Sequence, residues 1–190
     1  MVYFDTMATV YEAANRTFPA DVGILRLDLD DPQILDVVYG LDREATENVP
    51  GVLPLHTPEK LKDFLCYKHP GSETYGAAAP GQAELLGYAT IAPTNVYPDE
   101  ARTWRVAELV NIGVHPDRAR ARGIGSFLFR YCLEMAAQHG ACRLDLYVSP
   151  DNERAAAFYM NTCGMFPAVH MGDRPFGPEG GARLILTRRT

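Results

Sequence analysis

The sequence predicts one α/β domain, a layered α+β arrangement of strands and amphipathic helices around a mixed central sheet. Segments that alternate apolar and polar residues, such as 22–29 and 142–148, are interleaved with segments of helical spacing, such as 128–136. The 190 residues, 47% of them hydrophobic, suffice for one sizeable core, and no tract has the composition of a linker or a repeat. We therefore expect a single domain over residues 1–190, in which 1–20 form an extension before the first strand.

The first half of the chain is expected to contain a strand, two helices and a hairpin. Residues 22–29 alternate as a half-buried strand does, and Pro32 then stands at an early helical position. A second helix is expected over residues 57–65. A Pro-Gly turn pair separates residues 75–79 from 84–92, which predicts a hairpin. The apolar faces comprise Ile34, Leu35, Val38 and Leu41 in the first helix and Leu61, Phe64 and Leu65 in the second.

The second half continues the alternation of strands and helices. A longer strand is expected over residues 104–114, and a helix follows that ends at Gly140. Residues 142–148 alternate as a strand, residues 149–164 favour a further helix, and residues 183–187 favour a last strand. The helix before Gly140 has its apolar residues at helical spacing, and these are Leu128, Tyr131, Cys132, Met135 and Ala136.

Composition excludes several classes of function. The formal net charge of −6 argues against nucleic-acid and anionic-membrane partners, which need a broad basic surface. The 4 cysteines lie scattered in apolar segments, as buried thiols in a reducing compartment do. Cys66 and His69 could form half of a metal site, but no second ligand pair follows, so we expect no metal. Residues 1–18 are too polar for a signal peptide, and we expect a cytoplasmic protein.

One short stretch, HPDRARARGIGSFLF at residues 115–129, gathers arginine and glycine before an apolar run. A strand that leads through a glycine turn into a helix presents unpaired backbone N–H groups at the positive end of the helix dipole, which is an anion site. Leu128 stands where a dinucleotide fingerprint needs glycine, and no lysine precedes Ser126 as in a P-loop. Taken alone, the stretch is equally compatible with a solvated surface turn.

Two linked motifs decide between these interpretations. LVNIGVHP at 109–116 with RARGIG at 120–125 resembles the acetyl-CoA signature of the GNAT superfamily of N-acetyltransferases. NERAAAFY at 152–159 and CGMF at 163–166 resemble the later helix and closing element of that superfamily. The resemblance implies a GNAT-type mixed central sheet flanked by helices on both faces, with an acetyl-CoA core at about 104–166. It also implies an acyltransferase that uses acetyl-CoA, and it allows a homodimer.

The resemblance also implies a set of cofactor-binding residues. Backbone groups near the end of the long strand would pair with the pantetheine arm of acetyl-CoA like an extra strand. The arginine and glycine loop would hold the pyrophosphate, and Asn152 would contact the pantetheine region. The full set is Ile112, Gly113, Val114, Arg120, Arg122, Gly123, Ile124, Gly125, Ser126 and Asn152.

Two residues are candidate catalysts. The resemblance makes Tyr159 the acid that assists the leaving thiolate, although a helix tyrosine packed on the core is the plain alternative. Glu108 stands where relatives that modify lysine carry a catalytic glutamate, and it would share one face with Val110, Ile112 and Val114 in a regular strand. An exposed glutamate, or one paired with Arg105, is the alternative, and a bulge would reverse the facing.

The acceptor is expected to be a small-molecule primary amine. A lysine-like amine costs roughly 4.6 kcal/mol to be neutral at pH 7, whereas an α-amine costs about 1.4 kcal/mol. An enzyme without a firm base suits the second. Tyr147 stands where ribosomal-protein N-terminal acetyltransferases carry a glutamate, which weakens that assignment. The segments 42–55, 93–101 and 170–181 are expected to be loops that select the acceptor.

Two other functions remain open at this level. A protein N-terminal or lysine acetyltransferase would use the same cofactor groove with a peptide acceptor. A non-catalytic acyl-CoA sensor would retain the groove without transfer, although Asn152 and Tyr159 are both present.

Overall fold

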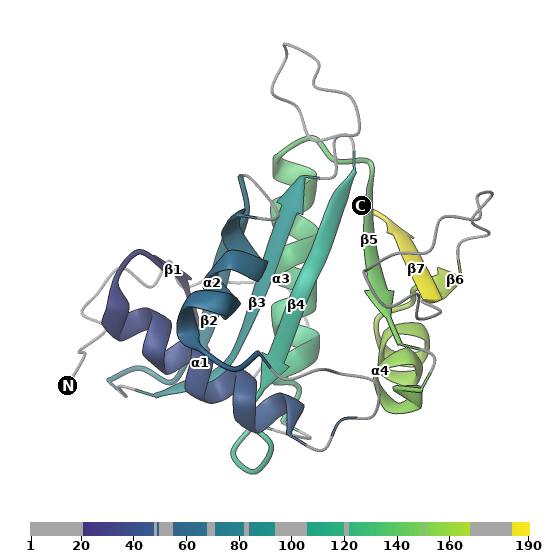
Figure 1. The fold of residues 1–190 in the computed structure, drawn as a ribbon. Helices are drawn as coiled ribbons and strands as arrows, with labels where there is room; N and C mark the ends of the chain where they lie inside the picture. Colours follow the sequence, from purple (N-terminus) through teal and green to yellow (C-terminus); the bar gives the residue numbers. More distant parts are fainter. Residues whose placement is uncertain are drawn as a thin grey trace.

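The computed structural model describes residues 21–47, 49, 55–67, 71–81, 84–93, 106–119, 122–149, 151–167 and 184–190. Its centre is a seven-stranded mixed sheet in the order β1-β2-β3-β4-β5-β7-β6 (Figure 1). All neighbouring strands are antiparallel except β4 and β5, which run parallel. The predicted α/β class with a mixed sheet is therefore confirmed.

The first half follows the predicted order. Asp31 caps α1 because its carboxylate accepts the amide of Gln33 at 2.8 Å, and Thr57 caps α2 through the amide of Lys60. Each helix has a proline in its first turn, where a missing N–H costs nothing. The elements are β1 (Gly23–Leu27), α1 (Pro32–Thr46), α2 (Pro58–Lys62) with the π-helical turn η1 (Asp63–Tyr67), β2 (Glu73–Ala78) and β3 (Leu85–Pro93).

The second half contains the long helix and the parallel pair. The elements are β4 (Ala107–Val114), α3 (Ile124–Gln138), β5 (Arg143–Val148), α4 (Glu153–Ala157) with the π-helical turn η2 (Phe158–Thr162), β6 (Phe166–Pro167) and β7 (Leu184–Arg189). The sequence does not predict β6, which is two residues long and pairs with β7. It also does not predict that β7 inserts between β5 and β6.

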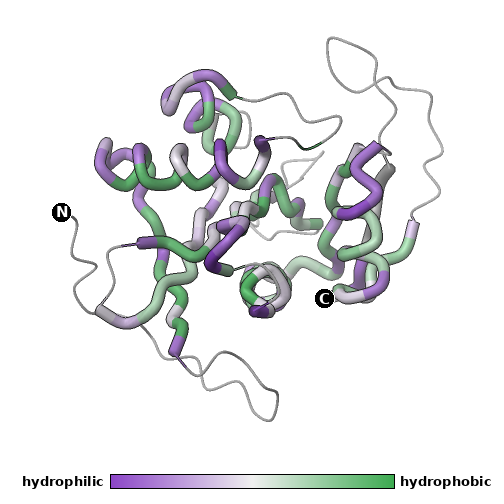
Figure 2. The backbone as a smooth tube through the Cα atoms, turned by 90° about the horizontal axis from the view of Figure 1, so that it is seen from below, coloured by the Kyte–Doolittle hydropathy of each residue, from purple (hydrophilic) through white to green (hydrophobic). Residues whose placement is uncertain are grey.

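Helices cover both faces of the sheet, as the resemblance implies. One cluster of buried residues joins the sheet to α1 and α2 and includes Leu27, Val38 and Tyr88. A larger cluster joins the other face to α3 and α4 and includes Ile91 and Leu128. In Figure 2, α3 is seen end-on below the strands, and α1 lies above them with hydrophilic and hydrophobic residues alternating along it. The sheet thus has two buried faces, each closed by amphipathic helices.

Candidate active site

The parallel pair β4 and β5 separates halfway along its length. Ala107, Glu108 and Leu109 of β4 pair with residues 144–146 of β5. Both strands continue beyond these pairs, β4 to Val114 and β5 to Val148, but no further pairing joins their described residues. Backbone groups of residues 110–114 that point toward β5 therefore have no partner strand on that side. Such an edge can accept one more extended chain by main-chain hydrogen bonds.

A bulge in β4 lies at the point where the strands separate. Thr90 of β3 pairs with Asn111 and Ile91 pairs with Leu109, so Val110 is the extra residue. The expectation that Glu108, Val110, Ile112 and Val114 share one face is therefore wrong. Val110 packs toward α1 and α2, whereas Ile112 and Val114 pack toward α3.

The amino terminus of α3 meets the end of β4 with free donors. Gly123 is the N-cap with a φ of 78°, in the left-handed region, and it offers no side-chain cap. By contrast, Asp31, Thr57 and Asn152 cap the other three described α-helices with side-chain oxygens. The first-turn amides of α3 therefore keep their hydrogens available for an anion.

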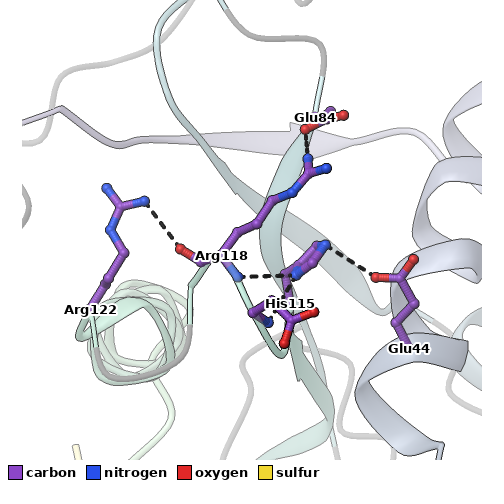
Figure 3. Close-up of polar contacts among 6 residues, drawn as sticks. Glu44, Glu84, His115, Arg118 and Arg122 are labelled. Carbon is purple, nitrogen blue, oxygen red and sulfur yellow. Dashed lines mark hydrogen bonds and ion pairs between the residues drawn. The ribbon is translucent and has the colours of Figure 1, made fainter.

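Arg118 and Arg122, which lie just before α3, both pair with carboxylates, and Figure 3 shows the pair of Arg118 with Glu84. Arg118 forms an ion pair with Glu84, and Arg122 lies 3.4 Å from Asp21. Arg122 also donates from Nη1 to the carbonyl of Arg118 at 3.2 Å. Exposed ion pairs of this kind are weak and exchange readily for a phosphate, which makes two charge-assisted bonds to a guanidinium.

Gly125 brings α3, η2 and β4 into contact. A Cβ on Gly125 would lie 3.3 Å from Cζ of Phe158 and 3.5 Å from Cγ2 of Val114. Any larger residue would push Phe158 away from the end of β4. The predicted cofactor residues Val114 and Gly125 thus pack together with Phe158, the residue before Tyr159.

Tyr159 is buried at this junction, with a relative exposure of 8%. Its ring lies 5.2 Å from that of Phe158 and 6.4 Å from that of Phe129, measured between centroids. Burial raises the pKa of its hydroxyl above the ordinary value, and the neighbouring thiols of Cys163 and Cys132 add to the rise. Tyr159 is therefore a hydrogen-bond donor that keeps its proton well above neutral pH.

Cys163 is a packed thiol. It is 3% exposed, and burial raises its pKa to about 12 although Arg188 and Arg130 act in the opposite direction. A thiol in that state has almost no thiolate at neutral pH, so Cys163 does not serve as a nucleophile.

Asn152 begins α4 directly after β5. Its Oδ1 accepts the amide of Ala155 at 3.1 Å, so half of the side-chain amide is engaged in the cap. Its Nδ2 takes no part in the cap. The side chain of Ile124 is fully buried in the core, so a ligand could reach that residue only through its backbone.

Glu108 is one of the last residues of β4 that pair with β5 before the two strands separate. Its flanking residues Ala107 and Leu109 face the α3 core, so alternation turns Glu108 toward α1 and α2. Its register partner in β5 is Asp145, on the same face of the sheet. Arg143 pairs with Asp145 at 3.0 Å. Two carboxylates therefore stand at the base of the opening, and the sequence interpretation missed the second.

A buried polar network next to the bulge was also missed. Asp42 of α1 is 3% exposed and accepts hydrogen bonds from the hydroxyl of Tyr88 and from Nδ2 of Asn111, the latter at 3.1 Å. Nδ2 of Asn111 also lies 2.7 Å from the hydroxyl of Tyr88. Asp42 lies in α1, so residues 42–46 are not the loop that the sequence predicts. Its spacing from Leu35 and Val38 places it on the apolar stripe, and that signal could have revealed it.

Some predicted positions lie outside the described residues. These are Arg105, Arg120 and the predicted extension at residues 1–20. Parts of the three acceptor segments also lie outside, namely residues 48 and 50–54 of the first, 94–101 of the second and all of 170–181. Ser126 is half-buried in the first turn of α3, and Gly113 is buried, with Cε1 of Tyr88 only 2.6 Å from where its Cβ would lie.

Comparison with known proteins gives the family. Residues 37–165 match the family model described as "Acetyltransferase (GNAT) family". The chain belongs to the GNAT acetyltransferases. The sequence-based identification of the chain as a member of the GNAT acetyltransferase family is thus confirmed.

Individual GNAT relatives match this chain either over a short segment or at low sequence identity. The chain is 49% identical over 53 residues to "Mycothiol acetyltransferase" of Clavibacter sepedonicus, which covers 28% of this chain and only 17% of that protein. The ribosomal-protein-S18-alanine N-acetyltransferase of Escherichia coli has a similar structure, with a TM-score of 0.63, 18% identity, and coverage of 88% of this chain and 93% of the other. The PaiA N-acetyltransferase of Thermoplasma acidophilum was solved in complex with coenzyme A. Its structure matches with a TM-score of 0.62 and 17% identity, and the match covers 89% of this chain and 99% of the other. These structural likenesses show the GNAT fold.

Two kinds of feature are absent from the residues that the structure describes. None of their helices is long and apolar enough to cross a membrane. Within the same ranges, no three His, Cys, Asp or Glu side chains are grouped so that they could hold a metal ion.

Proposed function

We propose that this GNAT enzyme transfers the acetyl group of acetyl-CoA to a primary amine of a small molecule. The observation that carries the proposal is the end of the β4–β5 ladder at Leu109 and Leu146, which leaves an extended backbone edge beside the uncapped start of α3. An extended pantetheine arm fits the first feature and a pyrophosphate fits the second.

The residues present fit this substrate. The open side of β4 at Ile112, Gly113 and Val114 would bind the pantetheine amides. Gly123, Ile124, Gly125 and Ser126 would bind the pyrophosphate through their amides, and Arg120 and Arg122 would bind it through their side chains. Nδ2 of Asn152 would contact the pantetheine region. Bound there, the thioester supplies an activated acyl carbon, so the protein needs only to bind, orient and move protons.

Transfer needs a base for the proton of the attacking amine and a hydrogen-bond donor for the leaving thiolate. Glu108 is proposed to accept the proton of the attacking amine, because it faces α1 and α2 at the base of the opening, and Asp145 beside it favours a cationic acceptor. Tyr159 is proposed to donate a hydrogen bond to the leaving thiolate. Its raised pKa makes complete proton transfer unfavourable, so the hydroxyl stabilises the thiolate while it keeps its own proton.

The acceptor class is part of the proposal. A small amine agrees with an enzyme whose base is a single carboxylate, because an α-amine is cheaper to deprotonate than a lysine. The partial match to mycothiol acetyltransferases supports the same chemistry. The similarity of fold to the ribosomal-protein-S18-alanine enzyme supports a peptide acceptor instead, so both classes belong in one panel. We propose a cytoplasmic enzyme in which residues 1–190 act as one domain.

Calorimetric titration with acetyl-CoA and coenzyme A tests the cofactor site. We expect micromolar binding by the wild type and at least about tenfold weaker binding by Arg122→Ala, since each charge-assisted contact to phosphate contributes about 1.5–3 kcal/mol. Arg143→Ala is the matched control, because that arginine also forms an exposed ion pair but lies at the start of β5. Absence of binding by the folded wild type would refute the proposed function.

An acceptor panel then tests the acyl transfer. Acetyl-CoA is combined with amino acids, polyamines, a peptide with an N-terminal alanine and a peptide with an internal lysine, and free thiol is measured. Transfer to small amines supports the proposal, transfer restricted to peptides supports a protein acetyltransferase, and tight binding without transfer supports a sensor.

A further inference from the structure

His115 follows the last residue of β4 and contacts two parts of the molecule at once (Figure 3). Its Nδ1 accepts the backbone amides of Asp117 and Arg118, each at 3.2 Å. Its Nε2 lies 3.2 Å from Oε2 of Glu44 in α1. The His115 side chain is 16% exposed, so these contacts are largely shielded from water.

These contacts fix the protonation state of the ring. Because two amides donate to Nδ1, that nitrogen must present a lone pair, and the ring proton must lie on Nε2. A proton on Nε2 donates to the Glu44 carboxylate. The geometry therefore selects the neutral ring with its proton on Nε2.

Backbone hydrogen bonds link the described residues of the loop that follows. The amide of His115 donates to the carbonyl of Leu86 in β3 at 3.0 Å, which anchors the start of the loop to the sheet. The amide of Ala119 donates to the carbonyl of His115 at 3.2 Å, and the amide of Arg122 donates to that of Ala119 at 3.2 Å. Arg122 also bonds to the carbonyl of Arg118. The amides that His115 accepts thus belong to the same turn that places Arg122 before α3.

We propose that His115 is a positioning residue that holds the phosphate-binding loop in its binding conformation and releases it when the ring is protonated. This inference rests on the proposed function, because it assumes that coenzyme A binds at the start of α3. A proton on Nδ1 removes the acceptor of two amides and places a donor against two donors. The turn then opens, Arg122 loses its support, and coenzyme A affinity falls as the pH is lowered.

The ring faces charged and polar groups from more than one part of the chain. Glu44 of α1 lies at Nε2, and the backbone amides of Asp117 and Arg118 donate to Nδ1. The Arg118 guanidinium pairs with Glu84, just before β3, and the Asp117 side chain is exposed. Histidine switches generally act in the range of about pH 5 to 8.

Two substitutions separate the functions of the ring. His115→Asn places an amide oxygen near the position of Nδ1 and cannot be protonated in this range, so it keeps the loop cap and loses the contact with Glu44. His115→Gln places its amide near the position of Nε2, so it keeps the contact with Glu44 and loses the loop cap. The two variants are matched in polarity and charge.

Calorimetric titration with coenzyme A at about pH 8, 7 and 5.5 tests the proposal. Dephospho-coenzyme A is titrated in parallel, because the second ionisation of a phosphate monoester near pH 6 would itself change affinity. We expect the wild type to lose about tenfold in affinity between pH 8 and 5.5 for both ligands, as two lost hydrogen bonds of about 0.5–1.5 kcal/mol each would produce. His115→Asn should stay within about twofold across the range, and His115→Gln should be weak at every pH.

Three results would overturn the inference. The first is a His115→Asn variant that loses affinity at low pH as the wild type does. The second is a folded His115→Gln variant that binds as the wild type does at pH 8. The third is a proton on Nδ1 of the wild-type ring at pH 8, detected by nitrogen NMR in the absence of ligand. If the wild type binds no coenzyme A at any pH, the proposed function fails, and the release of a phosphate-binding loop fails with it.

Discussion

Asn111, beside the bulge of β4, donates its side-chain amide to the buried carboxylate of Asp42 on α1 at 3.1 Å. The same carboxylate accepts the hydroxyl of Tyr88, which is fully buried in β3. Two residues farther along α1, Glu44 contacts His115 at the end of β4. Helix α1 therefore holds β4 at both ends of residues 111–115, the segment whose other edge is open toward β5.

Asp42→Asn is expected to change how stability depends on pH. Burial raises the pKa of Asp42, and the hydrogen bonds from Tyr88 and Asn111 only partly oppose that rise. The folded state therefore holds the proton to higher pH than the unfolded state does, whose aspartate pKa is about 3.9. The contribution of the carboxyl group is most favourable below that value and is lost as the pH rises through the folded-state pKa.

Urea unfolding at several pH values measures this effect. The unfolding free energy of Asp42→Asn should increase relative to that of the wild type as the pH rises from about 4 to about 7. Asp36→Asn, which removes a carboxylate from the exposed side of the same helix, is the control. A difference that is constant with pH, or one that Asp36→Asn reproduces, would contradict the assigned burial effect.

The bulge in β4 could not be read from the sequence because both faces of this strand are covered. Glu108, Val110, Ile112 and Val114 alternate regularly with other mostly apolar residues, so no polar face reveals a change of register. The strand itself was predicted over residues 104–114, and β4 spans Ala107–Val114. The side of the sheet that each residue faces depends on Val110, which only the pairing with β3 shows to be extra.

Motifs with fixed spacing were read more successfully than isolated residues. The RARGIG and NERAAAFY segments identify the GNAT family, since their glycines, caps and aromatic residues serve local backbone and packing needs. Asp145 and Asp42 were missed because their roles depend on partners far away in the chain, Glu108 and Asn111. Such contacts arise from the register of the sheet and the docking of α1.

Gly123→Ala is expected to lower both stability and coenzyme A affinity. The φ of 78° places Gly123 in the left-handed region, where a side chain costs about 1–2 kcal/mol, although no atom lies within 4 Å of the added Cβ. If the loop relaxes to relieve this strain, the amides at the start of α3 turn away from the anion. Gly140→Ala, with a φ of 84° at the other end of α3, is the matched control.

Thermal unfolding and calorimetry separate the two effects of these glycine variants. Both should destabilise by about 1–2 kcal/mol, but only Gly123→Ala should weaken coenzyme A binding, by about threefold or more. Equal losses of affinity in the two variants would mean that general destabilisation, rather than the loop, controls binding.

Glu108→Gln is expected to lower kcat/KM for the amine by about a hundredfold or more, the usual range for loss of a general base. The variant should also lose the part of the pH profile that reports ionisation of that base. Asp145→Asn changes the register partner on β5 and should chiefly raise KM for cationic amines. Steady-state kinetics with one accepted amine measure these effects. If Asp145→Asn, and not Glu108→Gln, altered the pH profile, the roles of the two carboxylates would be reversed.

Tyr159→Phe is expected to lower turnover while it leaves acetyl-CoA affinity nearly unchanged. The hydroxyl is proposed to stabilise the thiolate, which exists only late in the reaction, so kcat should fall by about tenfold or more and the Kd for acetyl-CoA should stay within about twofold. Because burial raises the pKa of Tyr159, the wild type should show no loss of kcat from deprotonation of this residue up to about pH 10. Tyr131→Phe, which removes a hydroxyl from a half-buried ring packed on Tyr75, is the control and should leave kcat unchanged. Turnover by Tyr159→Phe equal to that of the wild type with every accepted amine would leave Tyr159 as a core residue, and the thiolate would then need its donor from the backbone of β4.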